Sequence, residues 1–495
     1  MIPGSLSIGT VVRLTRWVAK RLVVVLAIAS LSGALHAADW SVSKGLTYGA
    51  VVSDNIALTE NDTQSDLIAL VTPSISFRRT GARASVDLFG ALQYQYYLDE
   101  GDHDFSPRLQ ADANTELVSD TVFFDARATI TQSVIDPFAP AGNDTLNRTG
   151  NSSTTLDYEL SPYVVSRVGG FADFEARYTY SDLLWGDESD FDSTGHDADV
   201  QLSNGEEITR TPWFVRGRYQ RYDYSEGGNR TDFRRLDAGI GYVFDRRWRL
   251  DGSIGREWND FVSDDPDVDG VRWDLFARWT PNIRTLLQVG YGNRFWGSAP
   301  SFDFSYRHRR SVIRASYSRQ LTNYSGLRRE VQVFDVVDAF GQPITDPVTG
   351  EDLTLELDVG IPSASVYVDE RFRLSYTLQG RRTNLRLNAS HGKFLFQDSG
   401  RDSVLATAGI SVSRFLGGGI SGDTGLSWNR EEDSNNPEGG NGNSKTWRFR
   451  MGLSRQLSPH TNARLGYSYA NRVTNREGDN DYQENRVSLV LASSW

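Results

Sequence analysis

The chain has 495 residues, and none of them is cysteine. A disulfide framework and a thiolate metal site are therefore excluded, and a chain without thiols can cross an oxidising periplasm unfolded without mispairing. Zinc-ligand spacings, phosphate-binding glycine loops and nucleic-acid modules are also missing from the sequence. The formal net charge of −12 argues further against nucleic acid, whose phosphates require a basic surface. We therefore expect no cofactor and no nucleic-acid partner.

Lysine is scarce, because only four of the 52 basic residues are Lys and the other 48 are Arg. A guanidinium group forms bidentate pairs with carboxylates and keeps its charge when it is partly desolvated. One interpretation is an interior polar surface on which Arg alternates with Asp and Glu. The other is a GC-rich genome, which raises Arg at the expense of Lys, and the composition leaves both open.

Long hydrophobic runs are missing beyond the N-terminus. A basic stretch, residues 13–21, precedes an apolar core, Leu22–Leu31, which is too short to span a bilayer. Small residues around Ala37 then offer a cleavage site. These features predict a cleaved signal peptide over residues 1–37 and a mature chain over residues 38–495. Without an apolar helix, the mature chain is either a soluble periplasmic protein or a membrane barrel.

Segments of about ten residues alternate apolar and polar side chains along the chain, which is the pattern of barrel strands. Within residues 271–279, for example, aromatic and aliphatic side chains fall on one face and charged ones on the other. The charged residues on the polar faces of three such segments are the candidate lumen lining: Asp125, Arg127, Arg272, Asp274, Arg278, Arg448 and Arg450.

The connections between these segments alternate between short basic ones and long acidic ones such as Asp99–Asp104 and Asp264–Asp269. Outer-membrane barrels have short periplasmic turns and long external loops. The sequence therefore predicts an all-β fold, a single large antiparallel transmembrane β-barrel of about 22 strands, with about 20 to 24 at the limits of the count. Both chain termini then lie in the periplasm, and the protein lies in the outer membrane of a Gram-negative bacterium.

A barrel of this size is too wide for side chains alone to fill, so we expect water, loops or a plug in its interior. The longest connection, residues 324–362, is external by strand parity and is the best candidate for a segment that enters the lumen. An inward constriction and an outward hairpin both fit its sequence.

The last segment, Arg486–Trp495, has the pattern of a closing strand that the barrel assembly machinery recognises. Its expected outward positions form the candidate assembly signal: Val487, Leu489, Leu491 and Trp495. The alternative is a soluble β-protein whose last residue is Trp. The outward faces imply membrane lipid and lipopolysaccharide as further partners.

Aromatic residues are expected where the membrane meets water, because their rings are apolar and their polar edges favour water. Such residues precede two external loops and flank the periplasmic turns: Tyr94, Tyr96, Tyr97, Phe394, Phe396, Trp248 and Trp279. We interpret them as membrane anchors rather than as sugar-binding platforms.

The sequence contains no catalytic constellation, so we expect no enzyme. Ser390 and His391 are neighbours in a strand segment, and adjacent strand residues face opposite sides, so they cannot act as nucleophile and base together. The stretch Asp99–Asp104 combines carboxylates with a His, but a solvated acidic loop explains it better. Acidic loops could hold divalent cations through carboxylate oxygens, yet no spacing defines a metal site.

Two regions resemble one protein family. Its motifs are Ser53-Asp-Asn-Ile-Ala-Leu58, Ser65-Asp66, Val71-Thr-Pro73, Thr80-Gly-Ala-Arg83, Thr129-Ile-Thr-Gln-Ser-Val-Ile-Asp-Pro-Phe-Ala-Pro-Ala-Gly-Asn143, Thr149-Gly-Asn151 and Ser161-Pro-Tyr163. These resemble the PEP-CTERM (exosortase) system-associated outer-membrane protein family over about residues 40 to 250. Ser74 and Ser152 depart from the pattern, which leads us to expect Gly and Arg there. The resemblance implies a place in exopolysaccharide production or surface-protein sorting, and no catalytic residues.

Three functions are weighed. The first is a pore or a component of a secretion complex, with exopolysaccharide or its export complex as partner, because an Arg-lined lumen attracts anionic polymers. The second is a structural, assembly or surface-anchoring barrel without transport activity, which predicts a lumen occluded by loops. The third, an outer-membrane hydrolase, is disfavoured because the required constellation is missing.

Overall fold

The structure is a computed structural model. It describes residues 39–142, 144–186, 191–225, 230–329, 334–335, 354–355, 361–434, 441–476 and 478–495. The predicted signal peptide, residues 1–37, lies outside the described residues.

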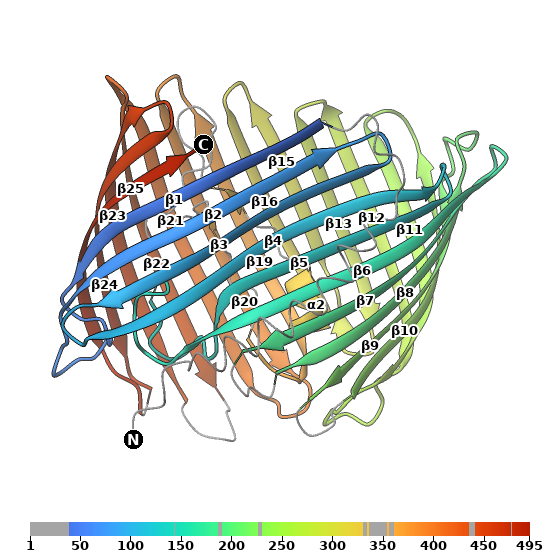
Figure 1. Ribbon diagram of the computed structural model, residues 1–495. Helices are drawn as coiled ribbons and strands as arrows, with labels where there is room; N and C mark the ends of the chain where they lie inside the picture. Colours follow the sequence, from blue (N-terminus) through green and yellow to red (C-terminus); the bar gives the residue numbers. More distant parts are fainter. Residues whose placement is uncertain are drawn as a thin grey trace.

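Long antiparallel strands make up most of the described chain (Figure 1). The barrel strands are β1 (Asp39–Ser53), β2 (Asp66–Thr80), β3 (Ala84–Tyr97), β4 (Asp102–Val118), β5 (Val122–Val134), β6 (Ser152–Val168), β7 (Ala172–Trp185), β8 (Ser193–Asn204), β9 (Trp213–Tyr224), β10 (Arg230–Val243), β11 (Trp248–Asp260), β12 (Gly270–Asn282), β13 (Thr285–Arg294), β15 (Ser301–His308), β16 (Ser311–Asn323), β19 (Val366–Gln379), β20 (Thr383–Phe396), β21 (Asp402–Gly417), β22 (Ile420–Ser434), β23 (Gly442–Ser458), β24 (Thr461–Thr474) and β25 (Tyr482–Ser494).

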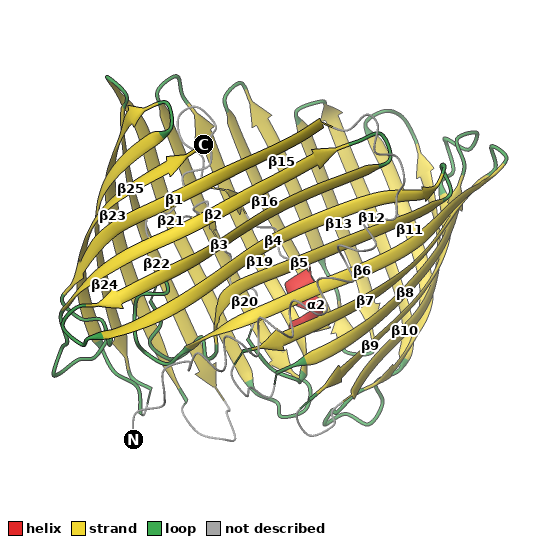
Figure 2. Cartoon of the chain, in the orientation of Figure 1, coloured by secondary structure: helices red, strands yellow, loops and turns green. Residues whose placement is uncertain are grey.

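Four short elements accompany them: β14 (Gly297–Ser298), β17 (Phe334–Asp335), β18 (Thr354–Leu355) and the helix α2 (Tyr324–Arg329). Figure 2 shows α2 within the outline of the barrel. Among the described residues, no helix is long and apolar enough to cross a membrane.

The sheet closes on itself, because β1 pairs with β25 as well as with β2. The closing register runs from Gly45 opposite Ser494 to Ser53 opposite Arg486. The sheet has 23 strands, and setting aside the two-residue β14 leaves the 22 strands of the barrel, so the predicted count is confirmed. Closure satisfies the backbone hydrogen bonds of every strand, which a membrane requires because its core offers no water.

Alternation gives the wall two chemically different faces. Large hydrophobic side chains such as Ile240, Ile254 and Leu275 are more than 60% exposed, and they form the outer, lipid-facing surface. Many charged side chains of the same strands lie on the opposite face and pair with one another, as Arg272 does with Asp237. The apolar outer face and polar inner face are those of a transmembrane barrel.

The connections alternate in length as expected, with short turns at one end and longer segments at the other. The stretch Asp99–Asp104 differs from its prediction as a long loop. The turn between β3 and β4 spans only residues 98–101, and Asp102, His103 and Asp104 already pair with β3. Because Tyr97 pairs with Asp102, the strand ladder extends into the acidic stretch, and acidic composition alone overestimated the length of the loop.

Aromatic pairs mark the outer face at the periplasmic rim, where the rings of Trp248 and Trp279 lie 5.8 Å apart. Tyr96 is also exposed on this face. Three other predicted anchors were assigned to the wrong face: Tyr97, Phe394 and Phe396 are buried inside the barrel. Tyr97 follows Tyr96 directly, and successive strand residues must point to opposite faces.

The C-terminal strand β25 closes the barrel beside β1. Val487, Leu489 and Trp495 of the candidate assembly signal are exposed, and Leu491 is half-buried. The backbone of Trp495 exchanges two hydrogen bonds of 2.9 Å with Lys44 of β1. The position suits an edge that is read during assembly; the recognition itself stays a prediction.

Candidate functional site in the barrel lumen

The connection between β5 and β6, residues 135–151, leaves the wall and crosses the lumen near the external end. We name it the inserted segment; Asn143 within it lies outside the described residues. Figure 1 shows this part of the chain, between β5 and β6, inside the outline of the barrel. Its contacts are with inward-facing side chains of strands on both sides of the β1–β25 closure, such as Tyr97 of β3 and Arg448 of β23, so it lies inside the barrel.

Local chemistry turns the inserted segment away from the sheet. Pro137 and Pro140 cannot donate a ladder hydrogen bond. The carboxylate of Asp136 accepts a hydrogen bond of 2.9 Å from the backbone N–H of Phe138, which closes a tight turn. Asn151 donates through its side-chain amide to the carbonyl of Asp136 at 2.8 Å, and so ties the two ends of the segment together.

A second close approach involves Gly142. A Cβ at this position would lie 1.9 Å from Oδ1 of Asn147, so a larger residue here would require the Asn147 side chain to move.

On one side the inserted segment is anchored to β3. The side-chain amide of Gln95 donates to the carbonyl of Thr145 at 3.0 Å. The Tyr97 hydroxyl donates to the carbonyl of Leu146, also at 3.0 Å. Leu146 is fully buried in an apolar cluster with Val51, Ile56, Ile68, Leu70 and Tyr97. Packing and hydrogen bonding thus hold this half of the segment.

On the other side the inserted segment lies on four arginines, which we name the cationic wall: Arg448 of β23, Arg472 of β24, Arg476 just after β24, and Arg486 of β25. All four donate hydrogen bonds to oxygen atoms of the segment.

Three of these contacts go to backbone carbonyls. Arg448 donates to the carbonyl of Ala141 at 3.2 Å, and Arg472 donates to the carbonyls of Ala139, at 3.1 Å, and of Phe138. The bonds come from charged donors, and such bonds are stronger than bonds between neutral groups.

The other contacts are ion pairs. Arg476 pairs with Asp136 at 3.2 Å, and Arg486 pairs with Asp144. Arg486 also donates to the side-chain oxygen of Asn147 at 2.9 Å and pairs with Glu484 at 2.7 Å. Its side chain is only 7% exposed, so the inserted segment covers it almost completely.

Phe138 anchors the inserted segment to the far wall of the barrel. It is buried in a cluster with Leu327, Ile361, Tyr367, Phe394, Phe396 and Leu405. The guanidinium carbons of Arg401 and Arg476 lie 5.7 and 5.2 Å from its ring centroid. Burial of a Phe side chain stabilises a structure by about 1.5–3 kcal/mol, so this contact helps to keep the segment across the lumen.

The helix α2 adds a second inward contact. Tyr324 is buried beside Leu183 and Trp185 of β7, and the hydroxyls of Ser325 and Ser193 of β8 lie 2.7 Å apart. The start of the predicted lumen loop, residues 324–362, therefore lies inside the barrel. Most of that loop, residues 330–333, 336–353 and 356–360, lies outside the described residues.

Arg148, at the external end of the inserted segment, joins it to the β3–β4 turn by pairing with Glu100 and Asp102. Burial lowers the pKa of Arg148, but the hydrogen bond with Asp102 and the negative charges of Glu100 and Asp104 outweigh it. The net effect raises the pKa above its ordinary value, so the guanidinium stays charged and the pairing persists at any physiological pH.

The seven candidate lumen-lining residues lie on the face opposite the exposed apolar side chains. Asp125 pairs with Arg177 at 2.8 Å, and Arg127 pairs with Asp112 at 2.9 Å. Arg278 donates to the side-chain oxygen of Gln288 at 2.9 Å.

In β12, Arg272 approaches Asp274 at 3.6 Å, and Arg294 pairs with Asp274 at 2.7 Å. Of the seven candidate residues, Arg448 belongs to the cationic wall, and Arg450 of the same strand lies close to Gly425 of β22. Four of the candidates therefore form ion pairs along the wall, Arg278 and Arg450 make other wall contacts, and Arg448 contacts the inserted segment directly.

Sequence reasoning missed the inserted segment as the feature that crosses the lumen. Residues 135–143 and 149–151 of the segment belong to the motifs of the family resemblance, and they were interpreted as a motif and not as a plug. A physical signal was available: Asp136-Pro-Phe-Ala-Pro-Ala-Gly interrupts the alternation between two long strand patterns, and it is too long for a plain turn.

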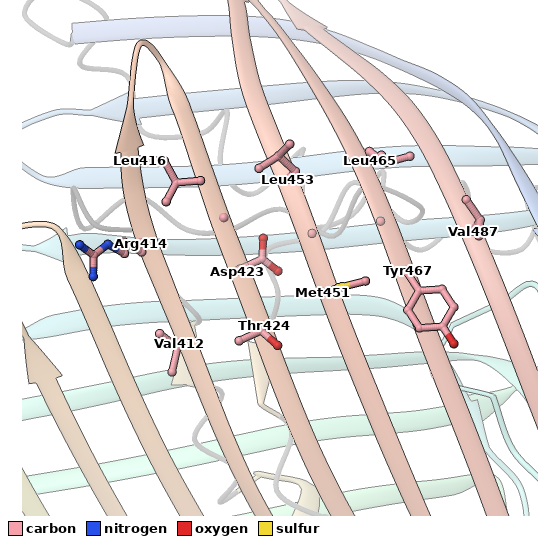
Figure 3. Close-up of a pocket in the computed structure, with 13 residues that line it drawn as sticks. Val412, Arg414, Leu416, Asp423, Thr424, Met451, Leu453, Leu465, Tyr467 and Val487 are labelled. Carbon is pink, nitrogen blue, oxygen red and sulfur yellow. The ribbon is translucent and has the colours of Figure 1, made fainter.

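No metal centre was found among the described residues, which contain no group of three or more His, Cys, Asp or Glu that could hold an ion. A hollow of about 510 Å³ lies over β21–β25 (Figure 3). Its lining includes Met451, Leu453 and Val487, which are about half exposed on the outer face, so it belongs to the lipid-facing surface and not to the lumen.

No family model and no curated protein matches the sequence. Solved structures match the fold. The siderophore receptor PirA from Acinetobacter baumannii is 9% identical, with a TM-score of 0.50 over 91% of this chain and 80% of its own. The ferric enterobactin receptor PfeA from Pseudomonas aeruginosa, in complex with enterobactin, is 9% identical, with a TM-score of 0.50 over 92% of this chain and 81% of its own.

Identities this low show a shared fold alone. A closed barrel with an apolar outer face is one of the two structures that can span a membrane, and barrels of this kind are found in bacterial outer membranes. The chain is therefore an outer-membrane β-barrel of a Gram-negative bacterium, structurally similar to siderophore receptors.

Proposed function

We propose that this protein is an outer-membrane conduit for an acidic exopolysaccharide, held closed by the inserted segment. The observation that carries the proposal is the set of contacts on the cationic wall. Its four arginines bind carboxylates and carbonyl oxygens of the segment. A polymer of carboxylated sugars presents the same chemistry, carboxylates spaced among neutral oxygen acceptors.

The charge balance of the wall supports an anionic occupant. When the inserted segment leaves, Asp136 and Asp144 leave with it. Glu484 and Asp479 remain paired with Arg486 and Arg472, so four guanidinium groups then face two partner carboxylates. A net positive surface inside a pore raises the local concentration of anions and attracts anionic polymers.

The family resemblance supports the same proposal from a separate direction. The inserted segment falls within the stretch from Thr129 to Asn151, which resembles proteins associated with exopolysaccharide production and exosortase sorting. The ligands of the siderophore receptors are not inferred for this chain, because the similarity to those receptors is one of fold alone.

The test replaces residues 137–149 with a short Gly-Ser linker and compares this variant with the intact protein. In planar bilayers the variant should conduct steadily while the intact barrel conducts rarely, and added polygalacturonate should block the current far more strongly than neutral dextran. In cells, deletion of the gene should abolish secreted polysaccharide. A variant that folds but does not conduct, or one that responds equally to both polymers, contradicts the proposal.

A structural role in a secretion or surface-anchoring complex is the second candidate. The lumen-spanning inserted segment favours it, since a barrel without transport activity tolerates an occluded lumen. Photo-crosslinking from the external loops should then recover a partner protein, and the linker variant should leave polysaccharide secretion unchanged. Loss of secretion without any crosslinked partner argues for the conduit instead.

A further inference from the structure

Two arginines stand on the lipid-facing side of the wall near the external ends of β10 and β11. Arg234 and Arg256 are exposed, and each lies on the outer face with Leu236 and Ile254, which are 51% and 63% exposed. The residue next to Arg256, Glu257, is buried on the inner face. Charge on the lipid side is costly in the middle of the bilayer, so the height of these residues matters.

Two tryptophans on the outer face of β11 set that height. Trp248 lies at the periplasmic rim, and Trp258 lies ten residues further along the strand. At about 3.3 Å per residue this distance is about 33 Å along the strand, and a tilt of about 40° reduces it to about 25 Å across the membrane. The apolar band of an outer-membrane barrel is about 25 Å tall. Trp258 and the register-paired Arg234 therefore stand at its external edge.

The two guanidinium groups are close neighbours with aromatic support. Arg234 lies opposite Trp258, and Arg256 lies two residues from Trp258 on the same face, which places the two arginines diagonally on adjacent strands. The Arg234 guanidinium is 5.7 Å from the ring of Tyr219, and that of Arg256 is 5.7 Å from the ring of Trp258. We name these four residues the outer arginine patch.

Two acidic side chains on the outer face near the patch already have partners. Asp232 pairs with Arg230 at 2.6 Å and accepts a hydrogen bond of 2.8 Å from the Tyr219 hydroxyl. Asp223 pairs with Arg221 at 2.8 Å. Among the described residues, no carboxylate forms an ion pair with either arginine of the patch, so both keep their charge available for an anion in the membrane interface.

We propose that the outer arginine patch binds the phosphate groups of lipid A, the phosphorylated glycolipid of the outer leaflet. A guanidinium pairs with phosphate through two parallel hydrogen bonds, and two of them on adjacent strands present a donor array that faces the leaflet. Tyr219 and Trp258 offer apolar rings beside the acyl chains and hold the guanidinium groups in place. This site is independent of any transport through the lumen.

The test is native mass spectrometry of the full-length barrel in detergent with purified lipid A. The intact protein should retain diphosphoryl lipid A and release its dephosphorylated form. The variant R234Q/R256Q should retain roughly tenfold less or lower still, since it loses two charge-assisted contacts. The control R79Q removes an outer-face arginine that lies 5.3 Å from Trp40 at the periplasmic end, and it should bind as the intact protein does.

Folding of each variant is checked by its heat-modifiable migration on gels, and both substitutions affect exposed positions. The double variant R234K/R256K keeps the charges but loses the planar fork, so its retention should lie between those of the intact protein and R234Q/R256Q. Equal retention by R234Q/R256Q and the intact protein overturns the proposal. Equal retention of lipid A with and without its phosphates overturns it too.

Discussion

Arg486→Gln should open the lumen by removing the most buried contact between the barrel and the inserted segment. In the intact protein Arg486 pairs with both Asp144 and Glu484, and all three side chains are 8% exposed or less. Without the guanidinium, two buried carboxylates face each other with no cation between them. Removal of one partner from a buried ion pair costs about 3–5 kcal/mol.

Departure of the inserted segment relieves most of that cost, because Asp144 then enters water while Glu484 stays on the wall. The closed state loses this stabilisation and the open state does not. Since each 1.4 kcal/mol is a factor of about ten in an equilibrium constant, the ratio of open to closed barrels should rise on the order of 10²- to 10³-fold.

Single-channel recording in planar bilayers measures this ratio directly as the fraction of time spent conducting. Arg464→Gln is the matched control, because Arg464 of β24 pairs with Asp423 of β22 at 2.7 Å and donates to Ser454 of β23, so these contacts are to the wall and not to the inserted segment. It should leave the fraction of conducting time unchanged. The triple variant Arg486→Gln with Asp144→Asn and Glu484→Gln should close again, because no charge remains to repel. Equal behaviour of Arg486→Gln and Arg464→Gln would refute the reasoning.

Three further predictions concern other parts of the barrel. Phe138→Ala removes a ring from the buried cluster that reaches Phe394, which should destabilise the closed position of the inserted segment by about 3–5 kcal/mol. A second substitution, Ala141→Cys, introduces the only thiol in the chain. Maleimide should label this thiol faster when Phe138→Ala is also present, and unchanged labelling contradicts the prediction. Leu275→Arg puts a charge on a 61% exposed lipid-facing position and should destabilise the barrel by about 2–4 kcal/mol in urea titrations in vesicles, whereas Ser316→Arg on the inner face should not. Trp495→Ala removes a candidate assembly residue and should lower the yield of heat-modifiable barrel in the outer membrane without changing the stability of the barrels that do fold.

Much of this fold follows from local sequence, because a strand in a membrane must alternate. The side chains that meet lipid have to be apolar and those that meet the lumen need not be, so period-two patterns such as residues 271–279 reveal strands and their faces without any tertiary information. Alternating connection lengths then determine topology and strand number. The same rule explains the error at Tyr97, since a residue next to the outward Tyr96 must point inward.

The occupant of the lumen could not be read in this way. The pairing of Arg486 with Asp144 joins residues 342 positions apart, and no local pattern links them. Composition indicated that the interior is rich in Arg, and the length of residues 324–362 pointed to a lumen loop whose start, at Tyr324 and Ser325, lies inside the barrel. Only closure of the sheet, through the pairing of β25 with β1, brings β23, β24 and β25 to the same side of the barrel as β3, and this arrangement creates the surface on which residues 135–151 rest. The number of strands, the face on which each side chain lies and the cellular compartment follow from the periodicity of the sequence. The contacts in the lumen depend instead on which strands become neighbours when the barrel closes.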